Sequence, residues 1–274
     1  KYQQRANSWM LMVASFGFVI STLPVQILLP MIGWRSIFLL ISILILLSII
    51  LILVFTPSWK NNPKNTITQE KGNLSDVWKN KFFISLIPLC FLNYGGVQAV
   101  QTLWAGPWML NVAGYSPLDS ATGLFWINIT MLFAFMFWGY ILPKFSSLGI
   151  DSIKIVKIGL PISYVVLFSI IIMGQNAGAI MFTLYILSSI VLSLTQPALA
   201  LSFPQNLAGK SLTSINVFIH SGTFFVQWGI GLLIDLSKNM GASTVTSYKI
   251  SFSIFLILCI FSYLFFIYFN KNEN

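Results

Sequence analysis

Charged residues are scarce in this chain: Asp, Glu, Lys and Arg make up 8% of its 274 residues, and hydrophobic residues make up 57%. About a quarter of the residues in a soluble domain are charged. The composition therefore excludes an ordinary soluble domain and indicates a polytopic membrane protein. The net charge of +9 does not indicate a nucleic-acid partner, because the basic residues lie in short connections between apolar runs.

Residues that carry chemistry are also few, with one histidine, two cysteines and six acidic residues. Cys90 and Cys259 lie inside apolar runs without paired-thiol or metal-ligand spacing, and we interpret both as packing residues. Nucleotide-binding loops and paired carboxylates are absent from the sequence. We therefore expect no catalytic residue, no metal site and no cofactor.

Long apolar runs predict an all-α membrane protein with eight spanning helices, since a span needs about 20 mainly apolar residues. We predict these helices at residues 8–30, 36–55, 82–104, 121–142, 153–173, 178–202, 212–234 and 248–269. The polar stretch 57–81 separates two helices from six and is interpreted as a linker. Because the chain opens with Lys1 and has no cleavable signal peptide, we interpret it as part of a longer protein.

Basic residues are distributed unevenly over the connections between these spans. Three of them, Arg35, Lys238 and Lys249, fall on one predicted side of the membrane. The other side collects twelve: Lys1, Arg5, Lys60, Lys64, Lys71, Lys79, Lys81, Lys144, Lys154, Lys157, Lys210 and Lys271. Since cytoplasmic loops are rich in Lys and Arg, we expect a multi-pass protein of the inner (plasma) membrane, with the linker and the C-terminus in the cytoplasm.

The predicted spans differ in polarity, and every third one is almost uniformly apolar. These apolar spans are expected to be lipid-facing struts: residues 36–55, 153–173 and 248–269. Four other spans carry amides, hydroxyls, Gly and Pro, and are expected to line a cavity: residues 82–104, 121–142, 178–202 and 212–234.

The stretch Cys90–Met109 concentrates polar groups inside a span. Its amides are Asn93, Gln98 and Gln101, and amides in hydrocarbon are costly unless they find partners. Tyr94, Gln98 and Gln101 follow at i, i+4 and i+7, so one helical face carries all three. We predict that this face lines a solute pathway, with close helix packing as the alternative.

Glycine and tryptophan residues in and near this stretch have a simpler interpretation. The pair Gly95-Gly96 permits either bending or close packing. Trp104, Trp108 and Trp126 are interpreted as anchors or rims at the membrane interface.

The span 212–234 holds a second polar face. Asn216, His220, Thr223 and Gln227 follow at i, i+4, i+7 and i+11. One interpretation places His220 in contact with a substrate or a proton, because histidine titrates near neutrality. The other is a network of hydrogen bonds that holds helices together.

Two further polar sites lie in the remaining polar spans. Gln196, before Pro197, stands at an expected kink, and we favour a structural role over binding there. Asn128 and Thr130 are two residues apart on one helix, so only one of them is expected to see a cavity.

Several local sequences resemble the major facilitator superfamily over the whole chain. Residues 4–38 look like that family's fifth helix and its Gly-Trp-Arg turn, here Gly33-Trp34-Arg35. The sequence from Gly139 to Gly149 looks like a degenerate copy of its Gly-x-x-x-Asp-Arg-x-Gly loop, with Pro143 at the acidic position. QTLWAGPWMLNVAGYSP, from Gln101, is similar to a segment of bacterial permeases of that family.

The resemblance implies a transporter of a small organic solute that works by alternating access, of which this chain covers helices five to twelve. Residues 1–56 would close the N-terminal bundle, 57–81 would link the halves, and 82–274 would form the C-terminal bundle. No acidic residue lies in mid-span, so a carboxylate for proton coupling would belong to the missing N-terminal helices. An eight-helix membrane enzyme and a nonfunctional remnant are the alternatives.

Overall fold

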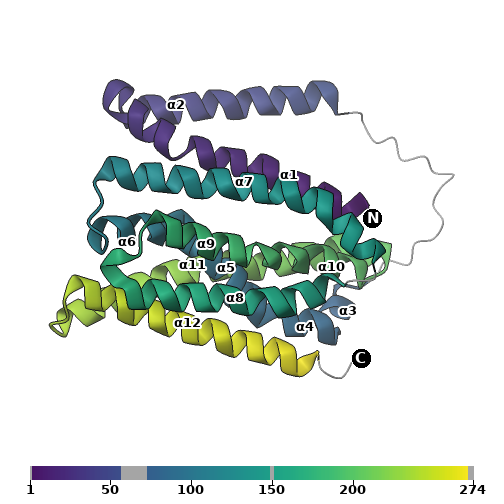
Figure 1. Ribbon diagram of the computed structural model, residues 1–274. Helices are drawn as coiled ribbons and strands as arrows, with labels where there is room; N and C mark the ends of the chain where they lie inside the picture. The colour runs from purple at the N-terminus through teal and green to yellow at the C-terminus, as the bar shows by residue number, and fades with distance from the viewer. Residues whose placement is uncertain (1, 57–72, 149–150, 271–274) are drawn as a thin grey trace.

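The computed structural model describes residues 2–56, 73–148 and 151–270, and every regular element in these ranges is a helix. Most helices run roughly parallel to one another in a bundle (Figure 1). Seven helices in the described ranges are long and apolar enough to cross a membrane, and a shorter apolar helix, Ser8–Ile20, accompanies them. The 57–72 part of the expected linker lies outside the described residues.

The first expected span, residues 8–30, is not one uninterrupted helix. Helix α1 covers Tyr2–Ile20, a turn follows at residues 21–22, and α2 covers Leu23–Phe55. Within α2 the backbone turns at Gly33, whose φ of 73° and ψ of 161° are non-helical. A positive φ is accessible to glycine at little cost. The expected turn at Gly33-Trp34-Arg35 is therefore present, while the first span is broken.

The segment of residues 81–111 forms one continuous helical path whose hydrogen-bonding pattern changes repeatedly. Two π-helical pieces interrupt the α-helix, and such pieces often mark functional sites. The path consists of α4 (Lys81–Pro88), the π-helix η2 (Leu89–Tyr94), α5 (Gly95–Ala99), the π-helix η3 (Val100–Trp104) and α6 (Ala105–Asn111). We call it the central helix.

The remaining helices follow in antiparallel order around the central helix (Figure 1). One of them is interrupted by the 3₁₀ segment η5 just before Gln196 and Pro197, where the sequence predicts a kink. Their bounds are α7 Pro117–Ser147, α8 Ser152–Met173, α9 Ala179–Ser189, η5 Ile190–Leu194, α10 Thr195–Leu201, α11 Gln205–Asn239 and α12 Thr244–Phe269, with the 3₁₀ turn η4 at Gly174–Asn176.

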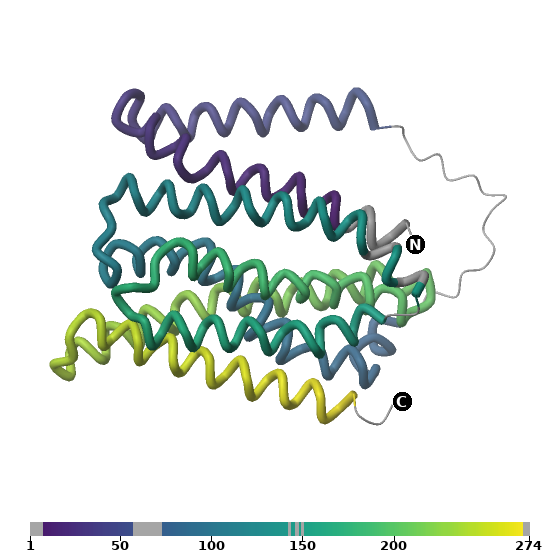
Figure 2. Tube along the Cα trace, in the orientation of Figure 1, coloured from purple at the N-terminus to yellow at the C-terminus, as the bar shows by residue number. Residues whose placement is uncertain are grey.

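Helix α1 packs along α7, whereas α2 stands at the edge of the molecule (Figure 2). None of the residues of α2, all of which are described, is buried. A helix that is apolar on all sides and exposed along its length suits an environment of hydrocarbon. This agrees with the expectation that residues 36–55 face lipid.

The short helix α3 (Leu74–Lys79) occupies the end of the expected linker. Val77 is fully buried, and the Trp78 ring lies 5.8 Å from that of Phe83 and 5.7 Å from that of Phe218. This end of the linker therefore packs onto the bundle.

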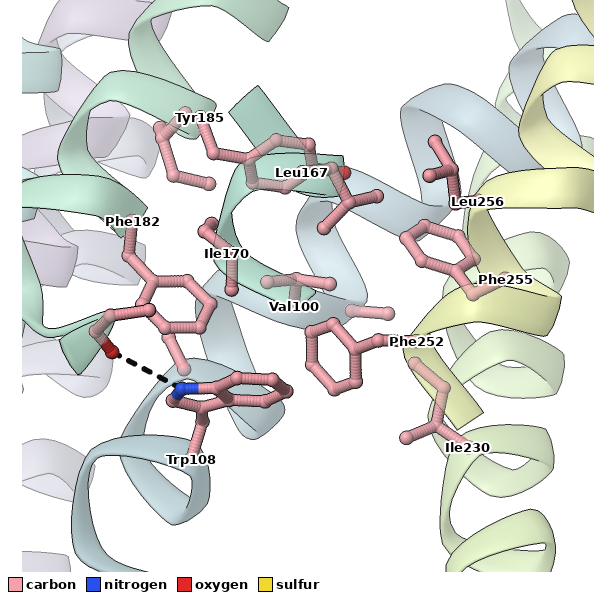
Figure 3. Packing of buried hydrophobic residues seen from close by; sticks show 14 of the residues in the cluster. Val100, Trp108, Leu167, Ile170, Phe182, Tyr185, Ile230, Phe252, Phe255 and Leu256 are labelled. Atoms are coloured by element: carbon pink, nitrogen blue, oxygen red, sulfur yellow. Dashed lines mark hydrogen bonds between the residues drawn. The ribbon is translucent and has the colours of Figure 1, made fainter. Parts of the chain in front are cut away.

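The larger of the two cores contains Trp108 (Figure 3). The Trp108 side chain is fully buried, its ring centroid lies 4.8 Å from that of Phe252, and its indole N–H donates to the backbone oxygen of Ala177 at 3.1 Å. The expectation of an interfacial anchor is wrong for Trp108, because the indole N–H finds its partner inside the bundle. Trp126, at 58% exposure, suits a rim position.

The central helix and α11 cross at two glycines. A methyl group at Gly95 would stand 2.6 Å from the backbone oxygen of Ile219, and one at Gly222 would overlap the backbone of Phe91. Gly96 packs equally closely against the Phe255 ring of α12. The packing interpretation of the Gly95-Gly96 pair is therefore correct, and both residues keep helical backbone angles.

We predict that Gly222→Ala destabilises the protein by about 1–3 kcal/mol, because its methyl group has to displace backbone and not a flexible side chain. The melting temperature of the purified protein in detergent measures the effect. Gly229→Ala on the same helix is the matched control, since a methyl group there meets nothing within 4 Å. Equal melting temperatures for the two variants would contradict the close crossing.

Candidate functional site

A cavity of about 80 Å³ lies between α1, the central helix, α7 and the α9–η5 segment. Its lining mixes amides and hydroxyls with aromatic and aliphatic groups. The lining residues are Leu11, Ala14, Ser15, Phe18, Tyr94, Val97, Gln98, Gln101, Met131, Phe135, Ile186, Ser189, Ile190 and Ser193. We call it the inner cavity.

A second cavity, of about 370 Å³, opens where α1 gives way to α2. It shares Phe18 and Gln101 with the inner cavity, so the two adjoin. Its lining residues are Phe18, Ser21, Thr22, Val25, Gln26, Gln101, Thr102, Ala121, Leu124 and Asn128. We call it the outer cavity. The residues that line the two cavities are all uncharged.

Gln101 stands between the two cavities and is held by α7. Its amide nitrogen donates to the Asn128 side-chain oxygen at 2.7 Å and contacts the Met131 sulfur at 3.3 Å. The Asn128 amide in turn donates to the backbone oxygen of Phe18 at 3.5 Å. These bonds join three helices at the boundary between the cavities.

The predicted face of Tyr94, Gln98 and Gln101 is present, since all three residues line the inner cavity. Of the pair on α7, Asn128 lines the outer cavity, while the Thr130 hydroxyl donates to the backbone oxygen of Trp126 within its own helix. As expected, one of the two sees a cavity.

Asn93 does not share that face. Its amide nitrogen donates to the Ser262 hydroxyl at 2.7 Å and to the backbone oxygen of Cys259 at 3.2 Å, and its oxygen accepts from the Tyr164 hydroxyl at 2.8 Å. Asn93 is 2% exposed. It therefore holds the central helix to α8 and α12, and those two helices are not merely lipid-facing struts.

The four polar residues of α11 divide between different neighbours. Thr223 donates to the Gln98 side-chain oxygen at 3.1 Å, and the Gln227 amide donates to the Thr102 hydroxyl at 2.9 Å. Both pairs join α11 to the central helix. The Trp104 indole adds a third link, because it donates to the backbone oxygen of Gln227 at 3.1 Å.

Asn216 and His220 have different surroundings from Thr223 and Gln227. Asn216 accepts from the Gln196 amide at 2.7 Å, which ties α11 to α10. His220 is exposed and lines neither cavity. Three of the four residues thus join helices, as the interpretation of this face as a hydrogen-bond network predicts, and none of the four lines the inner or the outer cavity.

Several cavity residues escaped the sequence analysis. They lie on α1, at the start of α2 and on α9–η5: Ser15, Phe18, Gln26, Ser189 and Ser193. Ser189 and Ser193 are four residues apart, a spacing that marks one helical face, but serine is too common in spanning helices for that spacing to stand out. In the described ranges, no group of three His, Cys, Asp or Glu residues could hold a metal ion.

The fold and the two cavities define an all-α, multi-pass membrane protein with an uncharged space between its helices that apolar and polar side chains line together. The sequence profile of the Major Facilitator Superfamily matches residues 1–227, so the chain belongs to that superfamily and is a membrane transporter. Neither a curated protein nor a solved structure matches the chain significantly.

We predict that Asn93→Leu lowers stability by about 1–3 kcal/mol, because it leaves buried partners on α8 and α12 without their hydrogen bonds. Thermal unfolding in detergent measures the loss. Asn239→Leu, at the exposed end of α11, is the control and should leave the melting temperature unchanged. An unchanged melting temperature for Asn93→Leu would show that the network carries no net stability.

Proposed function

We propose that the protein is a secondary transporter that moves a small organic solute by alternating access, and that the inner and outer cavities form part of its solute pathway. The observation that carries this proposal is the position of Gln101, whose amide lies at the boundary of both cavities and bonds to Asn128. A solute that passes from one cavity to the other has to pass this group.

The uncharged lining suits a solute that is recognised by hydrogen bonds. The side chains of Gln98, Gln101 and Asn128 supply both donors and acceptors, while Phe18 and Phe135 supply aromatic surface. Ligand sites commonly combine apolar walls with a few polar groups in this way. The proposed contacts of the solute are therefore Tyr94, Gln98 and Gln101.

The packing of α1 along α7 supports the proposed movement between two bodies. Residues 1–56 would belong to one bundle and 82–274 to the other, with 57–81 as the link. The inner cavity has walls from both, since α1 contributes Leu11 and Phe18, and α7 contributes Met131 and Phe135. A rocking of α1 against α7 would change the access to this cavity.

The uneven distribution of basic residues supports the proposed orientation. Lys144 lies in the last turn of α7, and Lys154 and Lys157 lie near the start of α8, at the end of the bundle where α12 also ends (Figure 1). The positive-inside rule assigns this end to the cytoplasm. We propose that the protein lies in the plasma membrane with this end inside the cell.

We predict that Gln101→Leu and Gln98→Leu each reduce solute uptake about 5- to 150-fold, since a lost hydrogen-bond partner costs about 1–3 kcal/mol. Uptake of a panel of radiolabelled neutral solutes into vesicles containing the purified protein measures this. Gln205→Leu, at the exposed start of α11, should transport normally. Full uptake by Gln101→Leu at normal abundance would place the pathway elsewhere.

For His220 we predict that His220→Gln leaves solute affinity unchanged, because the side chain lies outside both cavities. A second measurement, of uptake driven by an imposed pH gradient, tests proton coupling. A loss of gradient-driven accumulation in this variant, with equilibrium exchange intact, would assign proton movement to His220. A raised KM for exchange would contradict its position.

A further inference from the structure

A large cavity at the basic end of the bundle is separate from the solute pathway. It has a volume of about 670 Å³ and lies where α4 and α8 begin and where α10 and α12 end. It shares no residue with the inner or the outer cavity. We call it the basal cavity.

Two lysines give the basal cavity its charge. Lys81 and Lys157 both line it, together with one acidic residue, Asp151. Their formal charges leave an excess of one positive charge. Lys157 is half-buried, and its ammonium group donates to the backbone oxygen of Asn270 at 3.4 Å. An ammonium group has three donor positions, so this bond leaves capacity for an anion.

Neutral polar groups accompany the lysines in the lining. The Asn80 amide and the Ser202 hydroxyl also line the basal cavity. Asn270 is held in place from within the bundle, because its amide nitrogen donates to the Ser85 hydroxyl at 2.8 Å and to the backbone oxygen of Phe266 at 2.9 Å. The carbonyl oxygen that Lys157 contacts therefore has a fixed position.

Apolar side chains complete the lining. Phe82, Ile153, Ala198 and Leu201 contribute to it, and Leu201 is 60% exposed. The cavity thus combines a net positive charge with an apolar surface at the end of spanning helices, the depth at which a lipid has its head group above its acyl chains. A free inorganic anion would gain no binding energy from contact with the apolar surface.

We propose that the basal cavity binds the phosphodiester group of an anionic membrane lipid. Lys81 and Lys157 would contact the phosphate oxygens, the Asn80 amide nitrogen would donate to the head group, and the apolar residues would contact the first carbons of the acyl chains. One negative charge on the lipid matches the single excess positive charge of the cavity. Basic pockets between helices on the cytoplasmic side bind anionic head groups in this way.

The test measures lipid binding to the delipidated 274-residue protein in detergent by native mass spectrometry. We expect phosphatidylglycerol to bind with higher affinity than phosphatidylcholine. Lys157→Gln and Lys81→Gln should each weaken phosphatidylglycerol binding about fivefold, the effect of one lysine near an anionic lipid. Lys157→Arg should retain it. Lys154→Gln, which removes the same charge from an exposed position of α8 outside the cavity, should bind normally.

Three outcomes would overturn the proposal: equal affinity for the two lipids, equal weakening by Lys154→Gln and Lys157→Gln, or displacement of the bound lipid by millimolar inorganic phosphate, which would make the site one for a soluble anion. Melting temperatures of the lipid-free variants show whether each one folds. Should Lys157→Gln fail to fold, the variant Lys81→Gln, at an exposed position, and the variant Lys157→Arg still test whether the cavity binds the lipid. Solute uptake is not used as a readout, so the result is independent of the proposed transport function.

Discussion

The close crossing of the central helix and α11 at Gly95 and Gly222 is the contact on which the site depends. Because neither residue has a Cβ atom, the two backbones approach until a methyl group would overlap. Near this crossing polar side chains of the two helices meet, as Thr223 does with Gln98 and Gln227 with Thr102. In hydrocarbon such bonds replace those that water would make. Gln98 is thereby held at the wall of the inner cavity.

Composition and periodicity predict much of the fold. The spans after residue 81, the turn at Gly33 and the shared face of Tyr94, Gln98 and Gln101 are all present. These features depend on local properties, namely hydropathy, glycine and helical spacing. The break at residues 21–22 carries a weaker signal, since hydrophobic residues continue on both sides of it.

The failures share one physical cause. The expectations for Asn93, Trp108 and His220 each considered only the span that carries the residue, whereas the surroundings of these residues are set by other helices. Asn93 finds Tyr164 and Ser262, and Trp108 finds the carbonyl of Ala177. Helical spacing tells which residues share a face but not which neighbour that face meets. Ser189 and Ser193 were missed for a different reason: serine is common in spanning helices, so its spacing gives no distinctive pattern.

The π-helical pieces on either side of α5 have a consequence for how this site could change. Each piece widens the helix locally, as a single inserted residue would, and one residue corresponds to a rotation of about 100°. Asn93, which faces α12, lies within the first piece, and Gln98 and Gln101, which face the cavity, follow it. Deletion of one residue between Leu89 and Tyr94 would turn the part of the central helix before it by about 100° relative to Gln98 and Gln101. Short insertions and deletions here would exchange cavity-lining for packing side chains without any substitution.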